Sequence, residues 1–442
     1  MSKTARRKGT TRRKPAKRKP AKRKPSRSRA ARTQEISQEE IERELHDQEV
    51  APSDQRDVRI KRGGEVLPTD QAPADAAESL GTVKEPVPRA EGFRPSPLGW
   101  VARGIVMAAV GALVLGFPAS QPAADVTLFT KAITYAIIGL SLNVLIGYTG
   151  QISLGHQAFV GIGAFTSAYM VSQSEQPFLI AVVIAMFVGG AQAAVLGLVS
   201  LRVRGLYFAL VTLSYGLFAE KTLFKIETLT GGAAGQNAPR PGGFESEHRY
   251  FYLCVAVLAV VLWIDARLMK SKGGRALLAL RENPRVASTF GVNVTMYTLF
   301  AFVLSGVFAG LGGALLAHNN TQVSSVGFDF QLALIFVIMT VVGGLKSRPG
   351  IVIGSALFAL TGYLIENIPG VESALRNIPG LPELTPGAAA LVLGPLLLLL
   401  TLTVFPGGIG QQIRPITQWL IGKRFDPKDR GLREVLVTDV RA

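Results

Sequence analysis

Repeated apolar runs of membrane-spanning length set the strongest limit on how this chain can fold. About 20 apolar residues in a helix cross a bilayer, and fewer suffice where protein shields the segment. Backbone N–H and C=O groups find no water in lipid, so such runs must be helical. Ten runs qualify, near residues 100–117, 127–147, 157–172, 178–201, 206–224, 250–269, 297–318, 328–346, 350–366 and 387–405. The sequence therefore predicts an all-α membrane protein with about ten transmembrane or re-entrant segments.

The net charge of +17 belongs to the N-terminal tail and not to the apolar part of the chain. Residues 1–32 hold sixteen Lys and Arg and no acid, which leaves 32 basic against 31 acidic residues elsewhere. Residues 33–97 are acidic on balance and Pro-rich, a composition that buries too little apolar surface to offset ordering entropy. We therefore expect a disordered extension over 1–97, a membrane domain over 98–410 and a tail over 411–442. The basic stretch suits solvent or anionic membrane lipids better than nucleic acid.

The distribution of Lys and Arg between the spans predicts the orientation. One set of connections is rich in basic residues, and the other holds only Lys225, Arg240, Arg249 and Arg376. Short loops rich in Lys and Arg stay on the cytoplasmic side. The rich set consists of Arg202, Arg204, Lys270, Lys272, Arg275, Arg281, Arg285, Lys346 and Arg348. We expect a multi-pass protein of the plasma (inner) membrane with its N- and C-termini in the cytoplasm.

The connection over residues 273–293 is longer and more structured than a hairpin needs. Asn283-Pro284 supplies an N-cap and a first helical residue, and Gly291 suits a left-handed C-cap, so two short helices are expected. The first places Leu277, Leu278 and Leu280 on one face with Arg275, Arg281 and Glu282 exposed; the second pairs Val286, Ala287 and Phe290. Such a cytoplasmic loop is typical of a docking element.

Polar and glycine residues interrupt the apolar region at 143–165. Gly147, Gly150 and Gly155 break the helix, and irregular backbone at membrane depth must be buried in protein or line an aqueous cavity. Broken helices are where transporters bind polar solutes. The candidate pathway residues are Asn143, Gln151, Ser153, His156 and Gln157. An equally weighted alternative is that these side chains only satisfy the broken backbone and hold helices together.

Motifs for catalysis, metal binding and nucleotide binding are missing from the sequence. No HExxH, CxxC, G-x-S-x-G or G-x-x-x-x-G-K-[ST] pattern occurs, so we expect no enzyme activity, no metal and no cofactor, and any ATP hydrolysis would belong to another chain. Few charges lie within the runs, which argues against coupling to protons or sodium. Snorkelling to the interface accounts for Lys131, Glu220 and Lys221.

Four stretches together carry a family resemblance. They are GLSLNVLIGYTGQISLGHQAFVGIGAFTSA (139–168), RGLYFALVTLSYG with LTGGAAG (204–216, 229–235), GRALLALRENPRVASTFGVNV with FAFVLSGVFAGLGGALLAH (274–294, 300–318) and VVGGLKSRPGIVIGSAL (341–357). In their order and spacing, residues 100–406 resemble the permease subunits of branched-chain amino acid ABC importers of the LivM type. The resemblance implies ATP-driven import of branched-chain or related small amino acids by alternating access. It also implies partners: ATP-binding cassette ATPases, a homologous second permease and an external substrate-binding protein.

The resemblance further implies a cytoplasmic coupling helix that fits a groove on the ATPase. It corresponds to residues 283–291, with the candidate coupling residues Arg281, Glu282, Asn283, Val286, Ala287, Phe290 and Gly291. The family's Glu-Ala-Ala positions read Arg285-Val286-Ala287 here, so the acidic residue is replaced. The main alternative is a passive channel or secondary carrier for a small polar solute such as urea or an amide, which would need no docking helix.

Overall fold

The computed structural model describes residues 58–60, 66–68, 97–203, 205–232, 234–361, 363–364, 395–396, 398–399, 401, 403–404 and 407–420. The chain divides into two units, Met1–Gly92 and Phe93–Ala442. In the first, β1 (Val58–Ile60) pairs antiparallel with β2 (Val66–Pro68). The remainder of the extension that we expect to be disordered lies outside the described residues.

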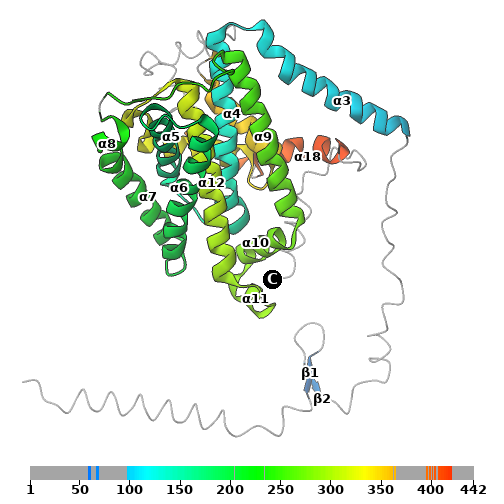
Figure 1. The fold of residues 1–442 in the computed structure, drawn as a ribbon. Helices are drawn as coiled ribbons and strands as arrows, with labels where there is room; N and C mark the ends of the chain where they lie inside the picture. The colour runs from blue at the N-terminus through cyan, green and yellow to red at the C-terminus, as the bar shows by residue number, and fades with distance from the viewer. Residues whose placement is uncertain are drawn as a thin grey trace, which may run out of the picture. The chain divides into compact units, whose positions relative to one another are not determined.

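The second unit is a helical bundle (Figure 1). Its α-helices are α3 (Pro97–Gly116), α4 (Ala123–Asn143), α5 (His156–Ser172), α6 (Phe178–Ser200), α7 (Leu206–Lys221), α8 (Glu227–Thr230), α9 (Glu247–Lys270), α10 (Lys272–Glu282), α11 (Pro284–Thr289), α12 (Val294–Asn320), α13 (Phe330–Gly343), α14 (Arg348–Ala359) and α18 (Gly408–Leu420). Short 3-10 turns are η3 (Phe117–Ser120), η5 (Leu223–Lys225) and η6 (Ser325–Phe328), and η4 (Val144–Thr149) is a π-helix. Strand β3 (Gln236–Asn237) pairs antiparallel with β4 (Gln322–Val323).

Membrane-length helices are confirmed, although the number of spans is not. Four helical segments of the described chain are long and apolar enough to cross a membrane: Ala123–Thr149, which joins α4 to η4, and α6, α9 and α12. Shorter apolar helices occupy several other expected runs, α13 and α14 among them. Most of the run expected at 387–405 lies outside the described residues. The all-α membrane class therefore holds, with the count of ten left as a prediction.

Helix α12 lies at the centre of the bundle, against α4, α5 and α6 (Figure 1). Glycines make this contact close. A Cβ built on Gly163 of α5 would lie 2.5 Å from Gly310 Cα, and one on Gly306 would lie 2.3 Å from the Gly189 carbonyl oxygen of α6. In lipid the hydrophobic effect does not drive helices together, because the lipid tails are as apolar as the helix surfaces. Close backbone packing of this kind provides the attraction instead.

The outer faces of α6 and α7 carry large apolar side chains that no described residue covers. On a membrane protein such a surface meets lipid or another membrane subunit. The most exposed of these side chains are Leu179, Val183, Phe187, Val195, Leu198, Leu206, Tyr207, Leu210 and Phe218.

The connections between helices gather at two opposite ends of the bundle. Helices α10 and α11 project from the lower end in Figure 1. The backbone around Gly147 and the turn at Lys346 contact them there. At the other end β3 pairs with β4, and Ala238, which follows β3, donates from its backbone N to the carbonyl oxygen of Thr321, which precedes β4, at 2.9 Å. This separation matches the loop sets that the Lys and Arg distribution predicts.

Helix α18 packs on the same end as α10. A Cβ on Gly410 would lie 2.3 Å from the Ser347 side chain, and one on Gly344 would lie 2.6 Å from the Gly407 carbonyl oxygen. The boundary expected at residue 410 thus falls inside a packed helix. The expected tail begins with residues that are helical as far as Leu420.

Candidate functional site

A broken helix forms the centre of the candidate site. Helix α4 runs into the π-helix η4, which stops at Gly150 in the left-handed conformation (φ 71°), and α5 begins only at His156. The Asn143 side chain fills the break, because its Oδ1 accepts a hydrogen bond from the Lys346 backbone N at 2.8 Å. A Cβ at position 147 would lie 2.0 Å from that same oxygen, so a larger residue there would displace the Asn143 side chain.

His156 joins three helices at this level. Its Nε2 lies 2.8 Å from Ser141 Oγ of α4, and Ser141 Oγ donates to the Ser305 carbonyl oxygen of α12 at 2.8 Å. Ser305 Oγ returns a bond to the Ser141 carbonyl at 2.9 Å. Since the Ser141 proton is used toward Ser305, a neutral His156 must donate from Nε2. Its Nδ1 is then an acceptor without a hydrogen-bond partner in the buried interior.

Gln157 and Ser153 are fully buried and have unpaired polar atoms. Both amide atoms of Gln157, and Ser153 Oγ, have no hydrogen-bond partner among the described residues. Gln157 lies against α7, where a Cβ on Gly216 would sit 2.5 Å from its Nε2. Leaving a buried amide unpaired is costly, about 1–3 kcal/mol per group. These atoms are therefore suited to a polar occupant of the helix break.

Four of the five candidate pathway residues are buried in the break or at the helix ends that flank it. They are Asn143, Ser153, His156 and Gln157. Gln151 differs, because it is half-exposed and lines a polar cavity of about 130 Å³. That cavity also contacts Thr149 and Gly150 of the break, and Arg281 and Pro284 of the following loop. Whether solute passes these residues stays a prediction.

The 273–293 connection folds as two capped helices, as the sequence predicts. Asn283 Oδ1 accepts from the backbone N of Arg285 at 3.0 Å and of Val286 at 3.3 Å. Gly291 is left-handed (φ 79°), and the Val292 N donates to the Ala287 carbonyl at 3.1 Å, which closes the C-terminus. Helix α11 buries Ala287 but leaves Val286 50% and Phe290 82% exposed.

Arg281 does not stay in solvent as the helix pattern predicts. Its guanidinium donates to the Gly147 carbonyl of the broken helix. The neighbouring Glu282 remains exposed, with an Oε1 3.8 Å from Lys346 Nζ. Burial and then the charge of Arg281 lower the pKa of Lys346, and Glu282 acts in the opposite direction. Helix α10 therefore contacts the π-helix η4 through Arg281 and, through Glu282, the turn at Lys346 whose backbone N binds Asn143.

Sequence reasoning missed a buried ion pair beside this contact. Asp265 of α9 is fully buried, and its Oδ2 accepts from Arg348 Nε of α14 and from the Tyr148 hydroxyl of η4, the latter at 2.8 Å. Arg348 also donates to the Asp265 carbonyl at 3.2 Å. The sequence feature that indicates this pair is Asp265 itself. A single carboxylate within an apolar run is expected to face the protein interior and to pair there with a basic side chain.

The opposite end of the bundle is closed by a network around Arg240. Its guanidinium donates to the Asn319 carbonyl at 3.1 Å and pairs with Glu247 at 3.0 Å. His318 lies 2.9 Å from Ser167 Oγ and 2.7 Å from the Pro239 carbonyl. These contacts fix the loop that precedes α9 onto the end of α12.

Glu220 has a structural role that snorkelling does not describe. Its Oε2 accepts from the Phe330 backbone N at 3.0 Å and so satisfies an unpaired N–H at the start of α13.

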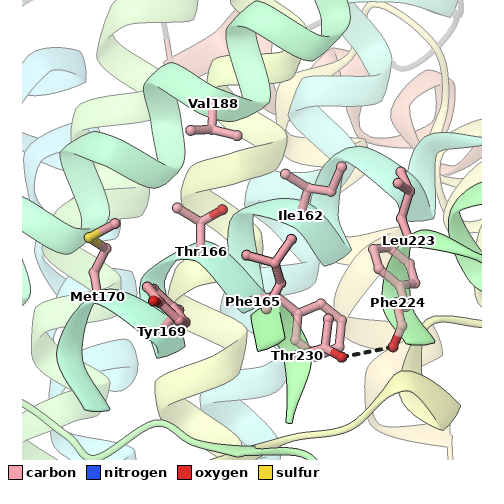
Figure 2. Close-up of a pocket in the computed structure, with 10 residues that line it drawn as sticks. Ile162, Phe165, Thr166, Tyr169, Met170, Val188, Leu223, Phe224 and Thr230 are labelled. Atoms are coloured by element: carbon pink, nitrogen blue, oxygen red, sulfur yellow. Dashed lines mark hydrogen bonds between the residues drawn. The ribbon is translucent and has the colours of Figure 1, made fainter. Parts of the chain in front are cut away.

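A cavity of about 330 Å³ opens between α5, α6 and the segment after α7 (Figure 2). Its walls are apolar except for Thr166, Tyr169 and Thr230, and the Thr230 hydroxyl is engaged with the Phe224 carbonyl at 3.0 Å. With no charged side chain in its lining, it offers nothing to the charged groups of an amino acid.

Comparison with known proteins agrees with this architecture. A family model described as branched-chain amino acid transport system / permease component matches residues 125–402. The high-affinity branched-chain amino acid transport system permease proteins LivM of Salmonella typhimurium and Escherichia coli are each 29% identical over 295 residues, covering 60% of this chain and 69% of the relative. The guanosine ABC transporter permease protein NupQ of Bacillus subtilis is 25% identical over 272 residues, covering 52% and 78%.

Proposed function

We propose that this chain, which belongs to the branched-chain amino acid transport system permease family, is the membrane-spanning subunit of an ATP-driven importer of branched-chain amino acids. In this proposal the helices provide a solute path, and a separate ATPase chain provides the energy. Residues 283–291 form the joint between them.

The proposal rests on the α10–α11 segment, which has an exposed apolar surface on one side and a hydrogen bond to the broken helix on the other. On its outer side Val286 and Phe290 are exposed apolar side chains beyond the bundle, which suits a helix that inserts into a groove on a partner. On its inner side Arg281 holds the Gly147 carbonyl at the broken helix. A movement of the docked helix would therefore reach the break through one charged hydrogen bond.

The buried polar atoms at the break support a solute path. His156 Nδ1, the Gln157 amide and Ser153 Oγ are unpaired within the described structure, and Asn143 is buried at the end of α4 that leads into the break. Burial has removed the hydration of these groups, so a water molecule or a polar solute that binds them would recover the lost hydrogen bonds. Gln151 and Arg281 share the polar cavity between the break and α10–α11, which would be the cytoplasmic outlet.

Branched-chain amino acids are the substrate that we favour, because both LivM relatives are named for their transport. Other relatives are named for the transport of guanosine or of sugars. They are the guanosine permease NupQ and the galactose/methyl galactoside import permease protein MglC of Escherichia coli, the latter 34% identical over 126 residues. Their matches show that one permease architecture accompanies several solutes. Substrate choice therefore depends on local residues.

The remaining parts of the assembly follow from the same proposal. The end with α10 and α11 faces the cytoplasm, with the chain termini on that side, and the end with β3 and β4 receives solute from an external binding protein. A second permease covers part of the apolar outer surface and lipid covers the rest.

Co-purification tests this function against a channel or a secondary carrier. The tagged full chain is extracted in mild detergent from cells that also express candidate ATPase subunits. An importer subunit brings down a stoichiometric ATP-hydrolysing chain, and uptake stops when that chain's nucleotide site is inactivated. Uptake that persists without any ATPase subunit would support the passive alternative.

A further inference from the structure

A second polar cavity, of about 200 Å³, lies at the end of the bundle opposite α10 and α11. It is formed by α4, the C-terminal turn of α12, β4, η6 and the first turn of α13. A single water needs about 10–15 Å³ of such cavity space, so the cavity has room for a small solute. The residues that line it are Lys131, Tyr135, Leu316, Ala317, Asn320, Gln322, Val323, Ser324, Gly327, Phe328 and Leu332.

Lys131 brings a positive charge to this cavity without a counter-ion. It is half-buried, and none of the described Asp or Glu side chains forms an ion pair with it. Its Nζ lies 5.4 Å from the centroid of the Tyr135 ring, which lines the same cavity. An aromatic face compensates only part of the lost hydration of an ammonium group. An anionic group in the cavity would complete the compensation.

The nearest features of the wall do not supply that anion. Asp329, which follows η6 and caps α13 through a 2.9 Å bond from the Leu332 backbone N to its Oδ1, forms no ion pair with Lys131. Gln322 is likewise engaged, because its Nε2 donates to the Ala234 carbonyl at 2.9 Å. Among the described residues that line the cavity, Lys131 is the one with a charged side chain.

The other lining groups complement the remaining parts of an aliphatic amino acid. Ser324 and Asn320 bring oxygen atoms that can accept from an ammonium group. Leu316, Val323 and Leu332 form an apolar wall. A cation, hydrogen-bond acceptors and an apolar wall are the three features that a zwitterion with a hydrocarbon side chain requires.

The geometry points to this cavity as an external binding site for a small aliphatic amino acid, with Lys131 binding its carboxylate. The site receives the solute before it reaches the helix break, at the end of α4 farthest from Asn143. This inference rests on the proposed import function, since it gives that function a first contact point. It also replaces snorkelling as the account of Lys131.

Equilibrium binding to the purified full chain in nanodiscs tests the site. The probes are L-leucine, isovalerate, which retains the carboxylate, and isoamylamine, which lacks it. We expect Lys131→Met to weaken binding of L-leucine and isovalerate at least tenfold and not to weaken binding of isoamylamine, which the lysine repels. Lys131→Arg, which keeps the charge, should restore binding to within about threefold of the original chain. The matched control is Lys225→Met, which removes an exposed lysine of η5.

Equal L-leucine affinity in Lys131→Met and the original chain would overturn the site, as would the failure of the original chain to bind either carboxylate. The thermal unfolding midpoint of each variant separates loss of the site from loss of the fold. Lys131→Arg is a second variant, expected to be folded, in which binding can be measured. Binding is measured without an ATPase. A failure of energy coupling would therefore leave these affinities intact, whereas a failure of the site would change them.

Discussion

The guanidinium of Arg281 in α10 donates a hydrogen bond to the carbonyl oxygen of Gly147 in the π-helix η4, joining two residues 134 positions apart. The bond links the segment proposed to dock on the ATPase to the break proposed to carry solute. It is also supported sterically, because the left-handed Gly150 lies against the Arg281 side chain. The α10–α11 segment and the broken helix are therefore in direct contact through the Arg281 side chain.

Replacing Arg281 should uncouple docking from transport. A hydrogen bond from a charged donor contributes about 1.5–3 kcal/mol, so Arg281→Met should lower ATP-dependent uptake roughly tenfold or more while the ATPase still co-purifies. Arg275→Met, on an exposed position of the same helix, is the control and should transport normally. Normal uptake in Arg281→Met would show that the bond transmits nothing.

Charge on the exposed face of α11 should prevent docking. Phe290→Asp or Val286→Asp would bury an unpaired carboxylate in the interface, at a cost of several kcal/mol. We expect loss of the ATPase from pull-downs of the full chain, together with loss of uptake. Ser288→Asp adds the same charge to the same helix and should retain more of the partner. If Phe290→Asp keeps full association, the docking surface lies elsewhere.

Replacing Gln157 should change transport without lowering the stability of the fold. Its amide has no partner among the described residues, so Gln157→Leu should leave the thermal midpoint unchanged or raise the free energy of unfolding by up to about 1 kcal/mol. Uptake should nevertheless change, with a KM for L-leucine about tenfold higher. A destabilised variant would indicate that the amide is satisfied in the fold, and unchanged kinetics would place the solute path elsewhere.

The Asp265–Arg348 pair should stabilise, as a unit, the end of the bundle that carries α10. Removing one partner of a buried pair costs about 3–5 kcal/mol, and the lower end applies because Arg348 is 30% exposed. Asp265→Ala should therefore lower the thermal midpoint clearly, and the Asp265→Ala/Arg348→Ala double variant should be less destabilised than the two single effects combined. Strict additivity in this double-mutant cycle would contradict the pairing.

Glycine contacts around α12 should be intolerant of a methyl group. Gly163→Ala places a Cβ 2.5 Å from Gly310 Cα, and such overpacking costs about 1–3 kcal/mol. The yield of folded protein in size-exclusion chromatography should fall. Gly104→Ala in α3 is the control, since nothing lies within 4 Å of its added Cβ. Equal yields from the two variants would mean that α5 and α12 separate more easily than their backbone contact implies.

Local features of this chain could be predicted from the sequence, because their causes are local. Asn283 and Gly291 cap α11 through bonds to residues within a few positions, and Gly150 ends a helix by its own conformation. The family resemblance likewise rests on ordered motifs, and the family model covers the same region. What sequence could not supply is the partner of a side chain that leaves its own element.

Arg281 and Lys131 illustrate that limit. Helical periodicity placed Arg281 in solvent, but the nearby Gly147 carbonyl belongs to a segment far earlier in the chain. Hydropathy alone predicted an interfacial lysine at position 131, because the cavity around Lys131 is built from five elements of the fold. Asp265 was recognisable as a buried charge, yet its pairing with Arg348 across 83 positions required the packed helices.

Uptake of L-leucine into proteoliposomes tests the central claim most directly. The full chain is reconstituted with its second permease and ATPase subunits, the binding protein is added outside, and ATP or a non-hydrolysable analogue is enclosed. We predict accumulation of L-leucine above the external concentration that requires ATP hydrolysis and is lost in Phe290→Asp. Equilibration to the external concentration at the same rate with either nucleotide would contradict the account and identify a passive pathway.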